Sequence, residues 1–150
     1  MSQSLSKLYV HIIYHIKNSS AKIGREIEDE LYAYMAAILK DNDSIPILIN
    51  GEKEHVHILC IMSKNISLAK LVEKVKGQSS RWINTKYKLF KWQGGYAGFS
   101  VSQSLVQKTT QYIRKQKEHH KSKSYKEELI EFLKLYGVDY DSSYLWDDEN

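Results

Sequence analysis

Apolar residues along the chain follow two periods, which divide its first third into a strand and a helix. The β-branched and aromatic run Leu8–Ile16 predicts a strand, and the polar residues 17–20 predict a turn after it. From Ile23 onward, apolar residues recur at spacings of three and four, with charged residues between them. This period is typical of an amphipathic helix, which we expect over about residues 22–40.

Two short apolar runs follow, and a turn signal separates them. The first run, residues 45–49, contains Pro46, which favours the start of a strand or an edge position because proline has no backbone N–H to donate. Asn50-Gly51 favours a tight turn. Residues 45–49 and His55–Met62 are therefore expected to form a β-hairpin.

The middle of the chain predicts a second helix and a fourth strand. The helix is expected to begin near Ser67, and residues 76–81 either interrupt it or carry it on toward Trp82. The sequence pattern leaves both interpretations open. Beyond this segment, glycines allow a close approach of the backbone around the strand-like run Tyr96–Val101.

Two capping boxes predict the last two helices. Ser104-Leu-Val-Gln107 favours a helix that begins there and covers about residues 105–119. Ser124-Tyr-Lys-Glu127 favours a final helix, for which Gly137 is the expected C-terminal stop. A tail that ends in acidic residues follows it.

The order β-α-β-β-α-β, followed by two helices, predicts an α+β fold with a ferredoxin-like, split βαβ antiparallel sheet and additional C-terminal helices. We expect one domain over residues 1–150, with a core of about 7–102, a helix of about 104–120, and a C-terminal helix and tail of about 124–150. In this topology the first and third strands are neighbours at the centre of the sheet. His11 or His15 would then lie near the strand that begins at His55.

Composition and charge limit the class of protein. A chain of 150 residues with 42% hydrophobic and 27% charged residues suits one globular domain, and its net charge of +4 favours an anionic partner. Cys60 is the only cysteine, which excludes a disulfide framework and a cysteine-built zinc site and predicts an inert core residue. A signal-peptide pattern and long apolar stretches are missing, so we expect a cytoplasmic protein without a membrane segment.

Two histidines stand one residue apart in the apolar run around Val56. Because alternate side chains of a strand share a face, His55 and His57 would point both imidazoles at one spot, while Val56, Ile58 and Cys60 face a core. One interpretation is a pair of metal ligands on a rigid strand. The other is a half-buried strand whose outer face carries two polar residues.

Tyr112 and Gln116 stand four residues apart on a predicted helix, so both project from one face. A tyrosine phenol can act as a covalent nucleophile, and an amide oxygen can join two imidazoles around a divalent metal. An Mg²⁺ or Mn²⁺ ion there would polarise a phosphoryl group. Taken alone, the tyrosine is equally typical of a packed helix face.

Together these motifs resemble the single-tyrosine HUH transposases of small bacterial insertion sequences, which are related to the REP-associated tyrosine transposases. The matching segments are Tyr9–Ile13, Glu54–Leu59, Lys76–Arg81, Trp92–Ser102, Tyr112–His120, Gly137–Asp141 and Tyr144–Trp146. The resemblance implies that His55, His57 and Gln116 hold a divalent metal and that Tyr112 attacks a phosphate of single-stranded DNA. It further implies a 5′-phosphotyrosine intermediate, hairpin DNA ends as partner, and a homodimer in which the tyrosine helix can complete the partner's site.

Other polar and aromatic residues each allow more than one interpretation. Basic and aromatic residues between 74 and 92 are candidates for binding single-stranded DNA. They are Lys74, Lys76, Arg81, Trp82, Lys86, Tyr87, Lys88, Lys91 and Trp92. The alternative is a solvated helix face with buried tryptophans. His11 and Glu54 either orient the metal-binding histidines or have structural roles. His119 and His120 bind the DNA backbone, lie near the active site or end a solvated helix.

The sequence therefore predicts a metal-dependent transposase that cleaves and rejoins single-stranded DNA at the ends of an insertion sequence. A domesticated REP-associated hairpin nuclease would use the same chemistry. A non-catalytic module for single-stranded nucleic acid and a zinc-stabilised structural domain are alternatives from other classes.

Overall fold

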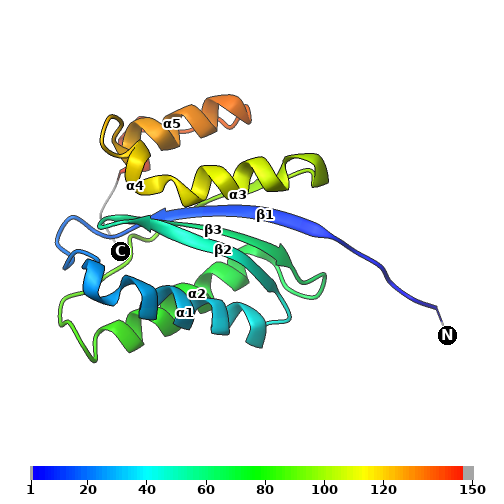
Figure 1. Cartoon of the computed structure of the whole chain (residues 1–150), viewed down its shortest axis with the longest axis horizontal. Helices are drawn as coiled ribbons and strands as arrows, with labels where there is room; N and C mark the ends of the chain where they lie inside the picture. Colours follow the sequence, from blue (N-terminus) through cyan, green and yellow to red (C-terminus); the bar gives the residue numbers. More distant parts are fainter. Residues whose placement is uncertain (1, 147–150) are drawn as a thin grey trace.

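A four-stranded antiparallel sheet forms the centre of the molecule (Figure 1). The computed structural model describes residues 2–146. The strands, in the spatial order β2-β3-β1-β4, are β1 (Leu8–His15), β2 (Ile45–Glu52), β3 (His55–Met62) and β4 (Ala97–Ser100). This order confirms the predicted α+β, ferredoxin-like arrangement, with β1 and β3 as the central pair.

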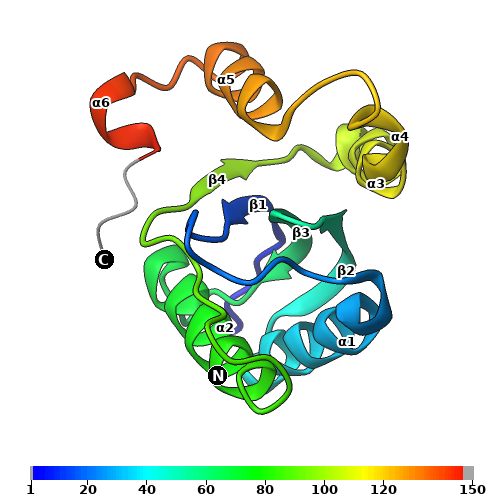
Figure 2. The same ribbon diagram turned by 90° about the vertical axis from the view of Figure 1, so that its left-hand side faces the viewer.

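Two long helices, α1 (Arg25–Asp41) and α2 (Leu68–Ile83), cover one face of the sheet (Figure 2). The strand residues that belong to this core are Val10, Ile12, Tyr14, Val56, Ile58 and Cys60. Leu31 of α1 and Leu71 of α2 pack against them and are fully buried. Residues 76–81 lie inside α2, so this segment continues the helix.

Shorter helices cover the opposite face of the sheet. They are the 3₁₀ turn η1 (Gln103–Leu105), α3 (Val106–Arg114), α4 (Gln116–His119), α5 (Tyr125–Leu135) and α6 (Ser142–Leu145). Figure 2 shows α3 and α4 over the β2–β3 side of the sheet and α5 over the β4 side. Because strand side chains alternate between faces, this layer receives His11 and His15 of β1 and His55 and His57 of β3.

The hairpin between β2 and β3 forms, but its turn is not at Asn50-Gly51. Both residues lie inside β2, and the turn is at residues 53–54. Asn50 instead donates a side-chain hydrogen bond to the backbone oxygen of Ile113 at 2.9 Å. A Cβ atom on Gly51 would lie 2.1 Å from the backbone oxygen of His55, so the glycine permits close strand approach rather than a turn.

The two predicted capping boxes differ in outcome. Ser124 accepts a hydrogen bond from the Glu127 backbone N–H at 3.2 Å and caps α5, and Gly137 follows this helix with a positive φ of 64°. The prediction at Ser104 is wrong, because this residue lies within η1 and α3 begins at Val106 without a side-chain cap. The expected single helix of about 105–119 is divided at Lys115 into α3 and α4.

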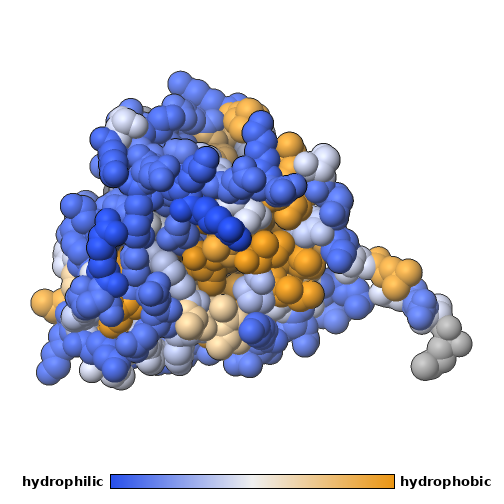
Figure 3. Space-filling model, viewed as in Figure 1, coloured by the Kyte–Doolittle hydropathy of each residue, from blue (hydrophilic) through white to orange (hydrophobic). Residues whose placement is uncertain are grey.

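Hydrophilic residues dominate the face shown in Figure 3, and an apolar patch interrupts them where β2 passes between the two helical layers. Ile45 of this strand has 57% of its surface exposed. Within residues 2–146, no helix combines the length and the hydrophobicity that crossing a membrane requires. Cys60 is buried in the core, where burial raises the pKa of its thiol to about 12.

Candidate metal centre and tyrosine site

His55 and His57 of β3 are fully buried under the layer of shorter helices. Each imidazole makes a hydrogen bond through its Nδ1 atom. Nδ1 of His55 lies 3.0 Å from Glu54 Oε1, and Nδ1 of His57 lies 2.8 Å from His11 Nε2. Hydrogen bonds of this kind orient an imidazole and leave its other nitrogen for a ligand. Both Nε2 atoms therefore turn toward the same space beneath α5.

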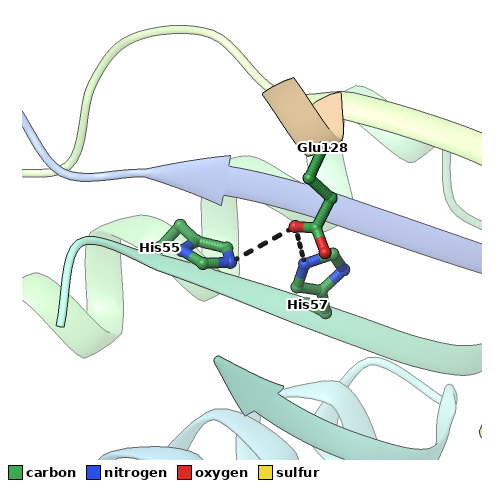
Figure 4. Close-up of side chains that lie close together, drawn as sticks. All are labelled: His55, His57 and Glu128. Carbon is green, nitrogen blue, oxygen red and sulfur yellow. Dashed lines mark hydrogen bonds and ion pairs between the residues drawn. The ribbon is translucent and has the colours of Figure 1, made fainter. Parts of the chain in front are cut away.

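Glu128 of α5 fills that space (Figure 4). Its Oε1 atom lies 2.9 Å from His57 Nε2 and 3.5 Å from His55 Nε2. One ligand atom from each of the three residues can be chosen so that all lie within 4.8 Å of one another. Two imidazole nitrogens and a buried carboxylate oxygen form a donor set that suits a divalent ion, so the cluster can hold a metal.

Tyr112 and Gln116 reach the same cluster from α3 and α4. The Tyr112 hydroxyl donates a short hydrogen bond to Glu128 Oε2, and the Gln116 side-chain N–H donates to the same oxygen at 2.9 Å. Gln116 Oε1 lies 3.0 Å from His55 Nε2. Although Lys115 interrupts the helix, the two side chains still converge, and Gln116 stands where a further oxygen ligand would be.

Two more histidines from the end of α4 pack around this centre. The His119 ring stacks on Tyr112 at a centroid distance of 4.6 Å. His120 Nε2 lies 3.0 Å from Gln116 Oε1 and 3.3 Å from Glu128 Oε1. These contacts favour a place beside the cluster over a solvated helix end for both histidines.

Burial and the Glu128 carboxylate set the protonation of the cluster. Burial by itself would lower the pKa of His55, but hydrogen bonds with Glu128 and Glu54 raise it to about 9. Burial dominates at His57 and lowers its pKa to about 4. Burial would raise the pKa of Glu128, yet its hydrogen bonds with His55, His57 and Tyr112 hold it well below the usual range. Burial and this carboxylate raise the pKa of Tyr112.

The cluster is closed to solvent in this arrangement. His55, His57 and Gln116 have no exposed surface, and Glu128 has 2%. α5, which carries Glu128, packs against the other three residues, with its Phe132 ring 5.4 Å from that of Tyr112. A DNA phosphate could therefore reach both Tyr112 and the imidazoles only if the Glu128 carboxylate withdrew.

The sequence interpretation missed Glu128. Its signal is its position on the apolar stripe of α5, one residue before Leu129 and four before Phe132. An acidic residue in the buried register of an amphipathic helix is costly unless it is paired, so it marks a site that needs a carboxylate.

The candidate DNA-binding residues divide into exposed and structural ones. Lys74, Arg81, Lys86, Lys88 and Lys91 are partly or fully exposed on α2 and the segment after it. The prediction that Trp92 stacks on bases is contradicted, because its ring is buried and its Nε1–H donates to Ser79 Oγ at 3.1 Å.

Three others of these candidates have protein partners as well. The Lys76 ammonium donates to the backbone oxygens of Gln93 and Gly95, and burial lowers its pKa to about 8. Trp82 stacks on the Tyr34 ring at 5.1 Å, and the Tyr87 hydroxyl donates to Glu26. These contacts tie Trp82 and Tyr87 to α1 and tie Lys76 to the segment before β4.

Comparison with known proteins identifies the family of the chain. The family profile "Transposase IS200 like" matches residues 4–116, and the chain belongs to this family of transposases. The crystal structure of a candidate transposase from Deinococcus radiodurans R1 is similar, with 21% identity, a TM-score of 0.61 and coverage of 77% of this chain and 98% of that chain. No curated protein matches the chain.

A second solved structure is that of a REP-associated tyrosine transposase bound to a REP hairpin. The two sequences are 12% identical and the TM-score is 0.58. The matched region covers 80% of this chain and 74% of the chain of that transposase. Both structures share the fold. The family accounts for a DNA-cleaving and strand-transferring enzyme.

Proposed function

We propose that this transposase cleaves and rejoins single-stranded DNA with Tyr112 as nucleophile and a divalent metal held by His55 and His57. One observation carries the proposal: the Tyr112 hydroxyl and the two imidazole Nε2 atoms all face the Glu128 carboxylate. A phosphate placed where this carboxylate lies would meet the nucleophile on one side and the metal ligands on the other. Such convergence of a nucleophile and charge-stabilising groups is what phosphoryl transfer requires.

The polarity of the proposed reaction rests on the resemblance to single-tyrosine HUH transposases. The Tyr112 oxygen bonds to phosphorus, the bond from phosphorus to the 3′ oxygen breaks, and the phenol proton is released while the leaving oxygen gains one. The products are a 5′-phosphotyrosine and a free 3′-hydroxyl, and attack by a 3′-hydroxyl on the phosphotyrosine reverses the step. An Mg²⁺ or Mn²⁺ ion, when bound, would stabilise the charge on the phosphate oxygens.

Glu128 and Gln116 offer two oxygen donors at the same place. In the closed arrangement Glu128 would be the third ligand of a bound metal, because its carboxylate lies between the two imidazoles. When a DNA phosphate replaces the carboxylate, Gln116 Oε1 remains next to His55 as the protein oxygen ligand. The two residues thus serve successive states of one site.

Single-stranded DNA with hairpin ends is the proposed partner, which the hairpin-bound relative supports. Whether such ends flank an insertion sequence or belong to domesticated REP elements depends on the DNA around the gene. Within one chain the Tyr112 hydroxyl reaches Glu128, so attack within one subunit needs no exchange of helices. A homodimer with exchanged tyrosine helices remains the competing arrangement. Mixing Tyr112→Phe and His57→Ala subunits would restore cleavage only in that case.

The decisive experiment is a trapping assay with Tyr112→Phe as matched control. Labelled single strands from both flanks of the gene are incubated with protein and Mn²⁺ and then denatured. Wild-type protein is expected to form a DNA adduct that maps to Tyr112, whereas Tyr112→Phe binds the same strands without an adduct. Cleavage by Tyr112→Phe at the wild-type rate would overturn the assignment. Binding without any cleavage by the wild type would favour a non-catalytic module.

A further inference from the structure

A cavity of about 340 Å³ lies between the end of β1, the strand β4 and the helix α5. Its walls are largely aromatic and apolar, and they include Tyr96, Ala97, Phe99, Tyr125, Leu129 and Tyr140. Tyr96 and Tyr140 keep 41% and 40% of their surfaces exposed at the cavity. A concave site with aromatic walls and a solvent-facing side suits a flat, partly apolar group.

The cavity borders the metal centre. Tyr125, one of its wall residues, stacks on the His55 ring at a centroid distance of 5.1 Å with 16° between the planes. His15, which also lines the cavity, has its ring 5.2 Å from that of Tyr125. A group in the cavity is therefore separated from the metal ligands by the thickness of one aromatic ring.

A second, basic hollow adjoins the cavity at Gln93, a residue that lines both. Lys17, Lys76 and Lys91 line this hollow together with the backbone of Gly94. The Lys76 ammonium is held by two backbone oxygens, but Lys91 is exposed and Lys17 is partly exposed. Positive charge beside an aromatic cavity is the combination that binds a phosphate and its base in single-stranded nucleic acid.

We propose that this cavity receives one unpaired base of the DNA strand, from a nucleotide next to the phosphate that Tyr112 attacks. The inference rests on the proposed function and adds a site that selects the cleavage position. The shared wall at Tyr125 fixes the base beside the metal centre, and Lys17 and Lys91 receive the next phosphate along the strand. An apolar protein segment would fill the cavity equally well but would leave the lysines without a partner.

A thermodynamic cycle between protein and DNA tests this site. The protein carries Tyr112→Phe, so that it binds without cleaving, and the DNA is the strand that the wild type cleaves. An abasic nucleotide is placed at each position around the scissile phosphate, and dissociation constants are measured by fluorescence anisotropy. At one position the missing base is expected to weaken binding about tenfold, the loss typical of one stacked base.

Removing the cavity walls should abolish that dependence on the base. With Tyr96→Ala and Tyr140→Ala together, the abasic nucleotide at the same position should change binding by less than about twofold, because the two exposed rings on which the base would stack are gone. Tyr34→Ala is the matched control, since Tyr34 is 36% exposed on α1 and lies outside the cavity. It should leave the tenfold abasic effect intact even if it weakens binding overall.

The outcomes separate this inference from the proposed function. Cleavage at Tyr112 without coupling at any position would overturn the base site and leave the catalytic assignment standing. If no flanking strand is cleaved, the cycle is repeated with an oligothymidylate that carries one 2-aminopurine, whose fluorescence falls when the base stacks. Quenching that disappears in the Tyr96→Ala, Tyr140→Ala protein but persists with Tyr34→Ala would support the cavity alone, and quenching unaffected by either change would overturn it.

Discussion

The two faces of the sheet are both buried, yet they are built from different chemistry. Toward α1 and α2, β1 and β3 place apolar side chains such as Ile12 and Ile58. Toward α3 and α5, the same strands place His11, His55 and His57, all with at most 1% exposure. Burying polar groups costs stability unless they are hydrogen-bonded, so a polar face is retained where it has a function.

The two faces also differ in how specifically each side chain is bound by its neighbours. Apolar contacts tolerate many neighbours, whereas His57 has its two ring nitrogens within 2.9 Å of one partner atom each, on β1 and α5. The apolar face holds the fold together, and the polar face fixes the orientation of a few atoms. Substitutions on the two faces should therefore separate stability from activity.

The largest effect is expected for His57→Ala on the polar face. Losing a hydrogen bond that supports a metal ligand typically weakens metal binding on the order of 10–100-fold. Losing the ligand itself should weaken Mn²⁺ binding by more than this and should abolish cleavage. Titration calorimetry and the strand-cleavage assay measure the two quantities. Unchanged Mn²⁺ affinity would remove His57 from the metal site.

Leu31→Ala on the apolar face should do the reverse. Leu31 has no exposed surface, so its truncation should lower the free energy of unfolding by about 2–5 kcal/mol. Denaturant unfolding measures this loss. At low temperature, where the variant stays folded, its Mn²⁺ affinity should match the wild type, and a parallel loss of affinity would show that the faces are not independent.

The metal-free protein should be most stable near pH 6.5. The folded-state pKa of His55 is raised to about 9, so its contribution is complete below pH 6.5 and is lost as the pH rises to 9. The pKa of His57 is lowered to about 4, so stability also falls as the pH drops from 6.5 toward 4. Each limb amounts to at most about 3 kcal/mol.

Chemical denaturation in the presence of a chelator, repeated at several pH values, checks both limbs. His55→Gln should flatten the decline between pH 6.5 and 9 and leave the acid limb in place. Mn²⁺ affinity should follow the opposite trend and rise with pH up to about 9, because protons compete with the metal for His55. A stability of the metal-free protein that rises over this range would contradict the assigned hydrogen bonds.

The smallest expected effect concerns how α5 is attached. Ser124→Ala removes the side-chain cap of α5 and should lower the free energy of unfolding by about 1 kcal/mol. Ser104→Ala is the matched control, since Ser104 makes no cap hydrogen bond, and should change it by less than about 0.5 kcal/mol. If α5 must shift for DNA to enter, Ser124→Ala should also leave cleavage at or above the wild-type rate.

Much of the architecture could be predicted because local patterns and tertiary structure agree. The strand periods, the helix over about residues 22–40 and the cap at Ser124 all appear as expected. The turn expected at Asn50-Gly51 and the cap expected at Ser104 do not. In the first case the pairing of β2 with β3 continues past the local turn signal to Glu52, since ladder hydrogen bonds there outweigh the turn preference.

By itself the sequence determined which residues could share a face: His55 with His57 by the period of a strand, and Tyr112 with Gln116 by that of a helix. Only the tertiary structure decided what those faces meet. Glu128 reaches His57 across 71 residues of chain, and His11 reaches it across 46. Such contacts depend on how α5 and β1 pack over β3, and no local period encodes the orientation of one element on another.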